Sequence, residues 1–345
     1  MILEQFGWNE FFAGQLTAGI PGRVAAANHG RFLVWTETGE VEVGVTGSLR
    51  QTSPLWPAVG DWVVLRDDAL VIVKVLERRT KLSRKQPERL VREQVLAANI
   101  DVLFIVSGLD RDYNERRIER FLVMAHESGA RPVVLLNKTD LAGELGLDIA
   151  DVVARTALLA PGVQVIPLCA LSDHGLDALP ALLAPGETAA MIGSSGVGKS
   201  TMLNRLVGDQ RQRTNAVRAR DSRGRHTTTS RELFQMPGGW LLMDLPGLRE
   251  VQLWASAEQL QESFDDIQEL AQHCRFRDCA HAGEPGCAVT AAGLEPARLA
   301  NFLKMQQELA SLEKKTGPRP ARASKAKTKA PVKSGRPSPR PDRIK

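Results

Sequence analysis

The segment TAAMIGSSGVGKST at residues 188–201 decides the fold, because it joins a short apolar run to a glycine-rich turn and to the start of a helix. It satisfies the pattern G-x4-G-K-[ST], which requires a strand before it and a helix after it. In such a loop the backbone N–H groups point at phosphate oxygens, and the glycines let the chain approach them closely. We therefore predict a phosphate-binding loop, named the phosphate loop below, formed by Gly193, Ser194, Ser195, Gly196, Val197, Gly198, Lys199, Ser200 and Thr201.

Three polar side chains are candidates for balancing the charge of a bound triphosphate. Lys199 should reach the β and γ oxygens, and Ser200 should offer its hydroxyl to a magnesium ion. The short pattern D-x-x-G follows the apolar run WLLMD at residues 240–244 and places Asp244 and Gly247 after a strand. We expect the Asp244 carboxylate near the same magnesium ion and Gly247 in a switch segment.

The segment VVLLNKTDL at residues 133–141 carries a second motif, made of Asn137, Lys138, Thr139 and Asp140. The Asp140 carboxylate can accept hydrogen bonds from both N1–H and the exocyclic amine of guanine, whereas adenine presents no such pair of donors. These residue types also favour ordinary turns, so the motif gains its weight from the apolar strand before it and from the phosphate loop. The predicted ligand is a guanine nucleotide, which argues against a P-loop kinase that uses ATP.

The segment PLCALSDHGL at residues 167–176 resembles the Ser-Ala turn whose backbone contacts the guanine oxygen. Cys169 stands where serine is usual, and Ala170 follows it. The alternative for Cys169 is a small buried residue with no part in binding. Both base motifs precede the phosphate loop, whereas most proteins that use these motifs present the phosphate loop first.

Apolar runs and helical segments alternate around these motifs. Residues 101–107, 131–137, 163–170 and 187–193 are predicted strands, and residues 114–129 are a predicted helix with Asn114 as N-cap and Gly129 as stop. Residues 175–183 and the segment from Gly198 are also expected to be helical. The alternation predicts a parallel sheet with helices on both faces and a ligand at the carboxyl ends of its strands.

The N-terminal region reads as short strands with Gly and Asp at the corners, from residue 22 to residue 82. This pattern is typical of a small closed barrel, and an OB-like barrel fits best. Arg23, Arg31, Phe32 and Trp35 are candidate contacts for single-stranded or looped RNA, and a barrel that only docks other proteins is the alternative. Residues 77–94 are expected to be a basic linker.

Four soft metal ligands lie close together near the C-terminal end: Cys274, Cys279, His281 and Cys287. Three cysteines and a histidine suit a closed tetrahedral zinc site that holds a small unit together. The spacing departs from the common C-x2-C knuckle. His273 competes with His281 for the fourth position, and we interpret it as an ordinary helix-end residue. Helical spacing at residues 257–273 and 296–314 brackets the cluster.

The order of guanine motif, second base turn, phosphate loop, switch and metal carboxylate resembles the circularly permuted GTPases. The barrel before these motifs and the cysteine cluster after them narrow the resemblance to ribosome-associated small-subunit assembly GTPases of the RsgA (YjeQ) type, over residues 22–312. The resemblance implies GTP hydrolysis stimulated by the small ribosomal subunit, late maturation of that subunit, and binding of its rRNA. It also implies one structural zinc ion, because the family has this cysteine spacing, and magnesium with GTP.

The expected fold class is α/β, with an OB-fold barrel, a circularly permuted P-loop GTPase domain and a helical zinc-binding domain. We expect residues 1–85 to form the barrel with an N-terminal extension, residues 86–250 the GTPase domain, residues 251–315 the zinc unit and residues 316–345 a disordered tail. We further expect that GTP hydrolysis gates the grip of barrel and zinc unit on rRNA. A GTP-dependent RNA-binding chaperone module with incidental hydrolysis is the alternative.

Leu248 stands just after D-x-x-G, where many GTPases carry a glutamine that orients the attacking water. A leucine side chain has no donor or acceptor, so another group must act on the water. The segment GRHTTT at residues 224–229 lies where the first switch is expected. There His226 is the candidate catalytic residue and Thr228 a candidate magnesium ligand, with the switch residues Thr227 and Thr229 beside it. His226 in contact with rRNA is the alternative. Gly196 stands where potassium-dependent relatives carry asparagine, which argues against potassium-assisted catalysis.

The positive charge of the chain lies in its C-terminal tail. The formal net charge is +5, but residues 316–345 alone hold ten Lys and Arg against one Asp, so the rest of the chain is slightly acidic. This tail is a solubilising segment or an arm that adds salt-dependent affinity for nucleic acid. The sequence shows no signal-peptide pattern and no apolar stretch of transmembrane length, so we expect a cytoplasmic protein without a membrane partner. A clamp that acts on a large particle suggests a monomer.

Overall fold

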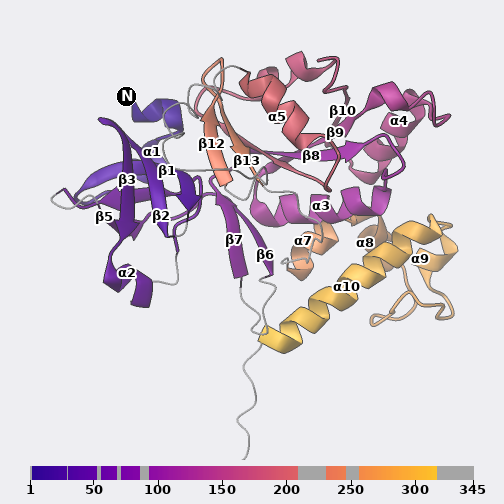
Figure 1. Cartoon of the computed structure of the whole chain (residues 1–345). Coiled ribbons are helices and arrows are strands. Elements are labelled where there is room, and N and C mark those ends of the chain that lie inside the picture. Colours follow the sequence, from indigo (N-terminus) through magenta and orange to yellow (C-terminus); the bar gives the residue numbers. More distant parts are fainter. Residues whose placement is uncertain are drawn as a thin grey trace, which may run out of the picture.

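The structure is a computed structural model, and it describes residues 2–28, 30–52, 56–67, 71–85, 93–208, 231–245 and 256–316. A barrel, an α/β region and a helical unit follow one another along the chain (Figure 1). None of the helices in these ranges is both long and apolar enough to span a bilayer. The basic tail beyond residue 316 lies outside the described residues.

Five strands form the N-terminal barrel: β1 (Ile20–Asn28), β2 (Arg31–Thr36), β3 (Gly39–Val45), β4 (Trp62–Leu65) and β5 (Val71–Val75). β1 pairs with both β2 and β4, β2 pairs with β3, β3 pairs with β5 in parallel, and β5 pairs with β4. The ring therefore closes on itself, and Val34, Val63 and Ile72 lie in its interior. This confirms the predicted OB-like barrel. Three short helices accompany it: η1 (Leu3–Phe6), α1 (Glu10–Ala13) and α2 (Gly47–Thr52).

The barrel residues that we expected to contact RNA are mostly buried. Arg23 is 2% exposed, Phe32 2% and Trp35 6%, so the expectation is wrong for these three. The aromatic rings pack inside the protein because they supply the apolar area that a small barrel needs. Only Arg31, whose side chain is 71% exposed beside Glu42, lies on the surface.

The α/β region contains the predicted parallel sheet, in the order β10-β9-β8-β11-β13. The antiparallel strand β12 (Arg231–Gln235) follows β13 at its edge. The parallel strands are β8 (Val102–Gly108), β9 (Arg131–Asn137), β10 (Gln164–Pro167), β11 (Thr188–Ile192) and β13 (Leu241–Asp244).

Helices cover both faces of this sheet, as predicted (Figure 1). Leu103 and Ile105 of β8 share a core with α3 (Glu115–Ser128) and α4 (Ile149–Leu159), whereas Phe104 and Val106 share a core with α5 (Lys199–Val207). The alternation follows from the opposite directions of successive strand side chains. The side chain of Asn114 caps α3 by accepting from the Arg117 N–H, and Gly129 ends the helix at φ 77°, both as predicted.

Two predictions for connecting segments are wrong. Residues 175–183 form two short 3-10 turns, η3 (Leu176–Ala178) and η4 (Pro180–Leu182), because Pro180 lacks the N–H that a continuous helix would need. The expected basic linker is partly a ribbon of two antiparallel strands, β6 (Lys81–Lys85) and β7 (Glu93–Ala98). Its alternating side chains suit a strand pair that is exposed on one face.

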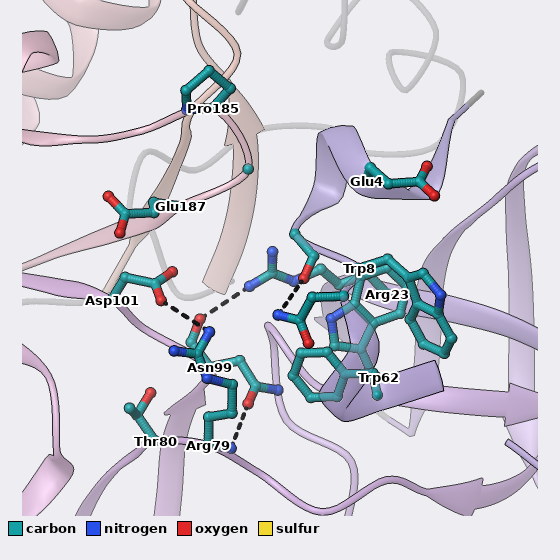
Figure 2. Close-up of a pocket in the computed structure, with 14 residues that line it drawn as sticks. Glu4, Trp8, Arg23, Trp62, Arg79, Thr80, Asn99, Asp101, Pro185 and Glu187 are labelled. Carbon is teal, nitrogen blue, oxygen red and sulfur yellow. Dashed lines mark hydrogen bonds and ion pairs between the residues drawn. The ribbon is translucent and has the colours of Figure 1, made fainter. Parts of the chain in front are cut away.

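The barrel and the parallel sheet are continuous. Ala26 and Ala27 of β1 pair with β12, so the two regions share one sheet. Near this junction the buried Arg23 guanidinium donates to the carbonyls of Phe6, Gly60 and Asn99 and to the Thr188 hydroxyl. Figure 2 shows the contact with Asn99. Burial lowers the pKa of Arg23 to about 10, so the side chain stays charged at neutral pH. Arg23 therefore connects the N-terminal segment, the barrel and the first residue of β11.

The C-terminal unit packs on α3. It contains α7 (Ala257–Glu262), α8 (Asp265–Ala271), α9 (Ala288–Ala291) and α10 (Pro296–Thr316), and α10 passes below α3 in Figure 1. The Arg298 guanidinium, nearly buried, donates to Glu119 of α3 and to Asp266 of α8 and lies 4.7 Å from the centre of the Phe264 ring. These contacts join the last helices to the helix that follows β8.

We expect the substitution Arg23→Met to destabilise the protein by at least about 3 kcal/mol, because it leaves several buried acceptors unpaired at about 1–3 kcal/mol each. Urea unfolding followed by circular dichroism measures this change. Arg31→Met, on the next strand, is the control and should change stability by less than about 0.5 kcal/mol. Equal effects of the two substitutions would contradict the structural role of Arg23.

Candidate functional site

The phosphate loop connects β11 to α5 at the carboxyl edge of the parallel sheet. Gly198 has φ 100°, and a Cβ there would lie 2.2 Å from Nδ2 of Asn137. A Cβ on Gly193 would lie 2.3 Å from the Val106 carbonyl oxygen of β8. Glycine is therefore required at both positions, because the loop passes directly against the ends of β8 and β9.

Lys199, the first residue of α5, turns its ammonium group back over the phosphate loop. Its Nζ donates to the carbonyl oxygens of Gly193, at 2.8 Å, and Ser194, at 2.7 Å. Burial lowers the pKa of Lys199 to about 8, and the Asp244 carboxylate opposes this shift. The loop thus holds a desolvated cation whose charge depends on pH just above neutrality.

Asn137, the last residue of β9, joins the base motif to the phosphate loop. Its Nδ2 donates to the Val197 carbonyl at 2.7 Å, and its Oδ1 accepts from the Ala170 N–H at 3.0 Å. The side chain is 2% exposed. A single amide therefore holds the phosphate loop, the strand end and the second base turn together.

The other base-motif residues lie on the same edge. Lys138 has φ 66° and donates to the carboxylate of Asp110, and the Thr139 N–H donates to the Leu168 carbonyl at 3.3 Å. Asp140 is exposed, and its Oδ1 lies 3.1 Å from Sγ of Cys169. The buried Cys169 thiol thus orients the Asp140 carboxylate while leaving it accessible.

Asp244 and Ser200 lie near the same edge. Asp244 ends β13, which pairs in parallel with β11. Its carboxylate is buried, and its negative charge partly offsets the lowering of the Lys199 pKa that burial causes. Ser200 is exposed at the start of α5. His226, Thr227, Thr228 and Thr229, as well as Gly247 and Leu248, lie outside the described residues.

Three residues that sequence reasoning did not select also contact the site. Asp110 contacts Lys138, while Asp112 and Arg117 both contact the hydroxyl of Ser194. They follow β8, and a polar segment at the carboxyl end of a parallel strand is the signal that would have found them.

The cysteine cluster lies in the C-terminal unit. One ligand atom from each of Cys274, Cys279, His281 and Cys287 lies within 4.8 Å of the others, and His281, not His273, is the histidine of this group. His281 Nδ1 is 3.7 Å from Sγ of Cys274 and 3.5 Å from Sγ of Cys287. Burial would raise the pKa of the Cys287 thiol, but hydrogen bonds from Thr290 and His281 outweigh it and lower the pKa to about 6. The donor set fits a soft divalent metal ion.

Comparison with known proteins agrees with this geometry. Residues 75–254 match the family profile described as RsgA GTPase. A small ribosomal subunit biogenesis GTPase RsgA from Opitutus terrae is 43% identical, covering 95% of each chain. The protein of the same name from Methanosarcina acetivorans is 43% identical over 90% of this chain and 86% of its own.

The chain belongs to the RsgA GTPase family. It is therefore a GTPase, which hydrolyses GTP to GDP and phosphate. The crystal structure of YjeQ from Thermotoga maritima is similar, with a TM-score of 0.60 and 26% identity over 84% of this chain and 98% of that chain. The structure of YloQ, described as a circularly permuted GTPase, has a TM-score of 0.59 and 23% identity over 84% and 95% of the two chains. The resemblance of the motifs to this family and the permuted fold are thus confirmed.

We expect the substitution Asn137→Ala to lower the free energy of unfolding by about 2–4 kcal/mol, because it leaves the Val197 carbonyl and the Ala170 N–H buried without their partner. Urea unfolding measures the loss. Gln164→Ala, which removes an exposed amide from β10, is the matched control and should have little effect. A loss below about 1 kcal/mol for Asn137→Ala would show that the loop is held by other contacts.

Proposed function

We propose that this chain is a GTPase of small ribosomal subunit biogenesis, that the small subunit stimulates its turnover, and that it acts as a cytoplasmic monomer. The observation that carries the proposal is the Asn137 amide, which joins a guanine motif and a phosphate loop in one site. Relatives that match 90% or more of the chain at 43% identity are named for biogenesis of that subunit.

In this proposal the phosphates of GTP bind residues 193–201 and the base binds Asp140, flanked by residues 137–139 and by Cys169 and Ala170. The contact between Asp140 and the Cys169 thiol supports the base position, because an oriented, exposed carboxylate can accept both guanine donors. The Lys199 ammonium, held on the inner side of the loop, supports the phosphate position.

Ser200 and Asp244, with Thr228, would hold the magnesium ion of bound GTP. The position of Asp244 at the end of β13, with its charge near Lys199, supports this assignment. Carboxylate and hydroxyl oxygens are the ligands that magnesium prefers. When bound, the ion neutralises charge on the β and γ phosphates. Gly247, Thr227 and Thr229 are proposed switch residues beside it.

The cysteine cluster is proposed to hold one structural zinc ion. Three thiols and an imidazole nitrogen, close enough to share one ion, make a complete tetrahedral set without an open position. The cluster lies between α8 and α9, so the ion would join the two halves of the C-terminal unit.

Purified protein is expected to contain one zinc ion per chain, measured by inductively coupled plasma mass spectrometry. Cys279→Ser should lose the ion and lower the thermal midpoint, because zinc binding contributes directly to the stability of small units. Cys169→Ser, which removes the only cysteine outside the cluster, should retain the ion. Retention of zinc by Cys279→Ser would contradict the assignment.

A groove between the barrel and the β6–β7 ribbon is the proposed rRNA-binding surface. It has a volume of about 910 Å³, and its charged lining includes Lys74, Lys81 and Arg231 against Glu77 and Glu93. Arg78 also lines it, but its guanidinium is paired with Asp61 and its side chain is only 8% exposed. The Trp56 ring, 46% exposed, also lines it. Cations with an exposed aromatic ring suit phosphates and unstacked bases.

The described contacts also support nucleotide-gated binding. The C-terminal unit is attached to α3 by Arg298 and by the Arg120–Glu308 ion pair at 2.8 Å, and α3 begins beside the phosphate loop. A shift at the nucleotide site therefore has a physical route to the C-terminal unit. The alternative is a GTP-dependent RNA-binding chaperone module in which hydrolysis is incidental.

Multiple-turnover GTP hydrolysis, measured with and without purified small subunits, tests the proposal. We expect strong acceleration by the subunits, whereas a flat response would favour the chaperone module.

His226→Ala should keep its affinity for GTP and lose most of the stimulated rate, roughly 100-fold or more, if His226 positions or deprotonates the attacking water. Unchanged stimulated turnover in this variant would assign the role to a ribosomal group.

Affinity for GTP should fall as pH rises through 8, because the phosphates favour charged Lys199 and the free ammonium loses its proton in this range. With a free-state pKa of about 8, the Kd should rise about tenfold between pH 7 and pH 9. Fluorescence titration with a labelled guanine nucleotide measures the change. Lys199→Arg is the control, since a guanidinium stays charged over the whole range. Equal pH dependence of both proteins would contradict the role of Lys199.

A further inference from the structure

The segment after β8 connects the two halves of the nucleotide site. Asp110 accepts from Nζ of Lys138 in the base motif, and its Oδ1 accepts from the Asp112 N–H at 2.9 Å. Asp112 in turn contacts the phosphate loop. This connection is formed by a part of the chain that belongs to neither motif.

Asp112 and Arg117 hold the hydroxyl of Ser194 from two sides. Ser194 Oγ donates to Asp112 Oδ2 at 2.8 Å and accepts from Nη1 of Arg117 at 3.0 Å. Arg117 also forms a bidentate pair with the Asp112 carboxylate. The hydrogen bond from Arg117 lowers the pKa of Asp112, so this group is a carboxylate at neutral pH.

Ser194, which Arg117 and Asp112 hold, also binds the Lys199 ammonium through its carbonyl oxygen. The Ser194 carbonyl accepts from Lys199 Nζ at 2.7 Å, so the hydroxyl and the carbonyl of one residue connect Arg117 to that ammonium. Arg117 itself is placed by the helix start, because its N–H donates to the capping side chain of Asn114 at 3.1 Å. The first turn of α3 is therefore a fixed support for the second residue of the phosphate loop.

We propose that Arg117 and Asp112 are positioning residues for GTP binding, which act through Ser194 to hold the phosphate loop in its phosphate-binding shape. This proposal rests on the proposed nucleotide site. The side chains of Arg117 and Asp112 are 34% and 48% exposed, so their ion pair adds little to folding stability. Their effect on nucleotide affinity is therefore separable from any effect on folding.

The test is nucleotide affinity and basal turnover in purified full-length variants. Arg117→Ala, Asp112→Asn and Ser194→Ala should each raise the Kd for GTP and for GDP by about five- to twentyfold, as loss of a charge-assisted hydrogen bond predicts. The kcat of Arg117→Ala and of Asp112→Asn should stay within about twofold, because the loop shape is needed equally in the ground state and the transition state. Arg117→Lys should recover part of the affinity, since a lysine keeps the charge and loses the bidentate geometry.

Two controls separate positioning from other effects. Arg116→Ala, which removes the exposed neighbouring arginine, should leave the Kd unchanged. The double variant Arg117→Ala/Ser194→Ala should bind no more weakly than the weaker single variant, because both changes break one shared contact. Multiplicative effects in the double variant, or an equal loss in Arg116→Ala, would overturn the proposal, and so would a Kd within twofold of the original in Arg117→Ala.

Lys199→Ala, measured in parallel, distinguishes the two levels of failure. If Lys199→Ala binds GTP normally, the nucleotide site itself is wrongly assigned. If it loses binding while Arg117→Ala and Asp112→Asn retain full affinity, the site stands and only the positioning role fails. Circular dichroism melting of each variant should give midpoints close to that of the original chain.

Discussion

The two hydrogen bonds of the Asn137 carboxamide hold the nucleotide site in one piece. One amide nitrogen fixes the Val197 carbonyl of the phosphate loop, and the amide oxygen fixes the Ala170 N–H of the second base turn. This buried side chain links the two motifs at the ends of β8 and β9, and the segment after β8 adds a second link through Asp110 and Asp112. The close approach of Gly198 to the same amide explains why that loop position must be glycine.

Helix α3 contacts both the phosphate loop and the C-terminal unit. Its first turn touches the phosphate loop through Arg117, and its middle carries Glu119 and Arg120, which contact α10. Helix α3 therefore lies between the proposed nucleotide site and the C-terminal unit that carries the cysteine cluster.

The barrel is attached to the GTPase region by backbone pairing and by one buried charge. β12 extends the parallel sheet into β1, and the Arg23 guanidinium satisfies carbonyls from three segments beside this junction. The barrel is thus fixed relative to β11, the strand that leads into the phosphate loop. The groove beside the β6–β7 ribbon is the surface that we propose for RNA.

The sequence by itself determined the fold class, the guanine and phosphate motifs, and the composition of the cysteine cluster, because each depends on local spacing and on residue chemistry. It also determined the cap and the stop of α3, which are local hydrogen-bonding events. It did not determine that Arg23, Phe32 and Trp35 are buried or that residues 77–94 partly form a ribbon. The break at Pro180 is encoded locally, because proline lacks the N–H of a continuous helix, and our prediction overlooked it. The contacts of Arg117, Asp112 and Asp110 were also decided only by the tertiary structure. Their contacts with Ser194 and Lys138 join residues that are far apart in the chain. Burial and pairing over such distances depend on how the strands are ordered in space, and no local pattern encodes that order.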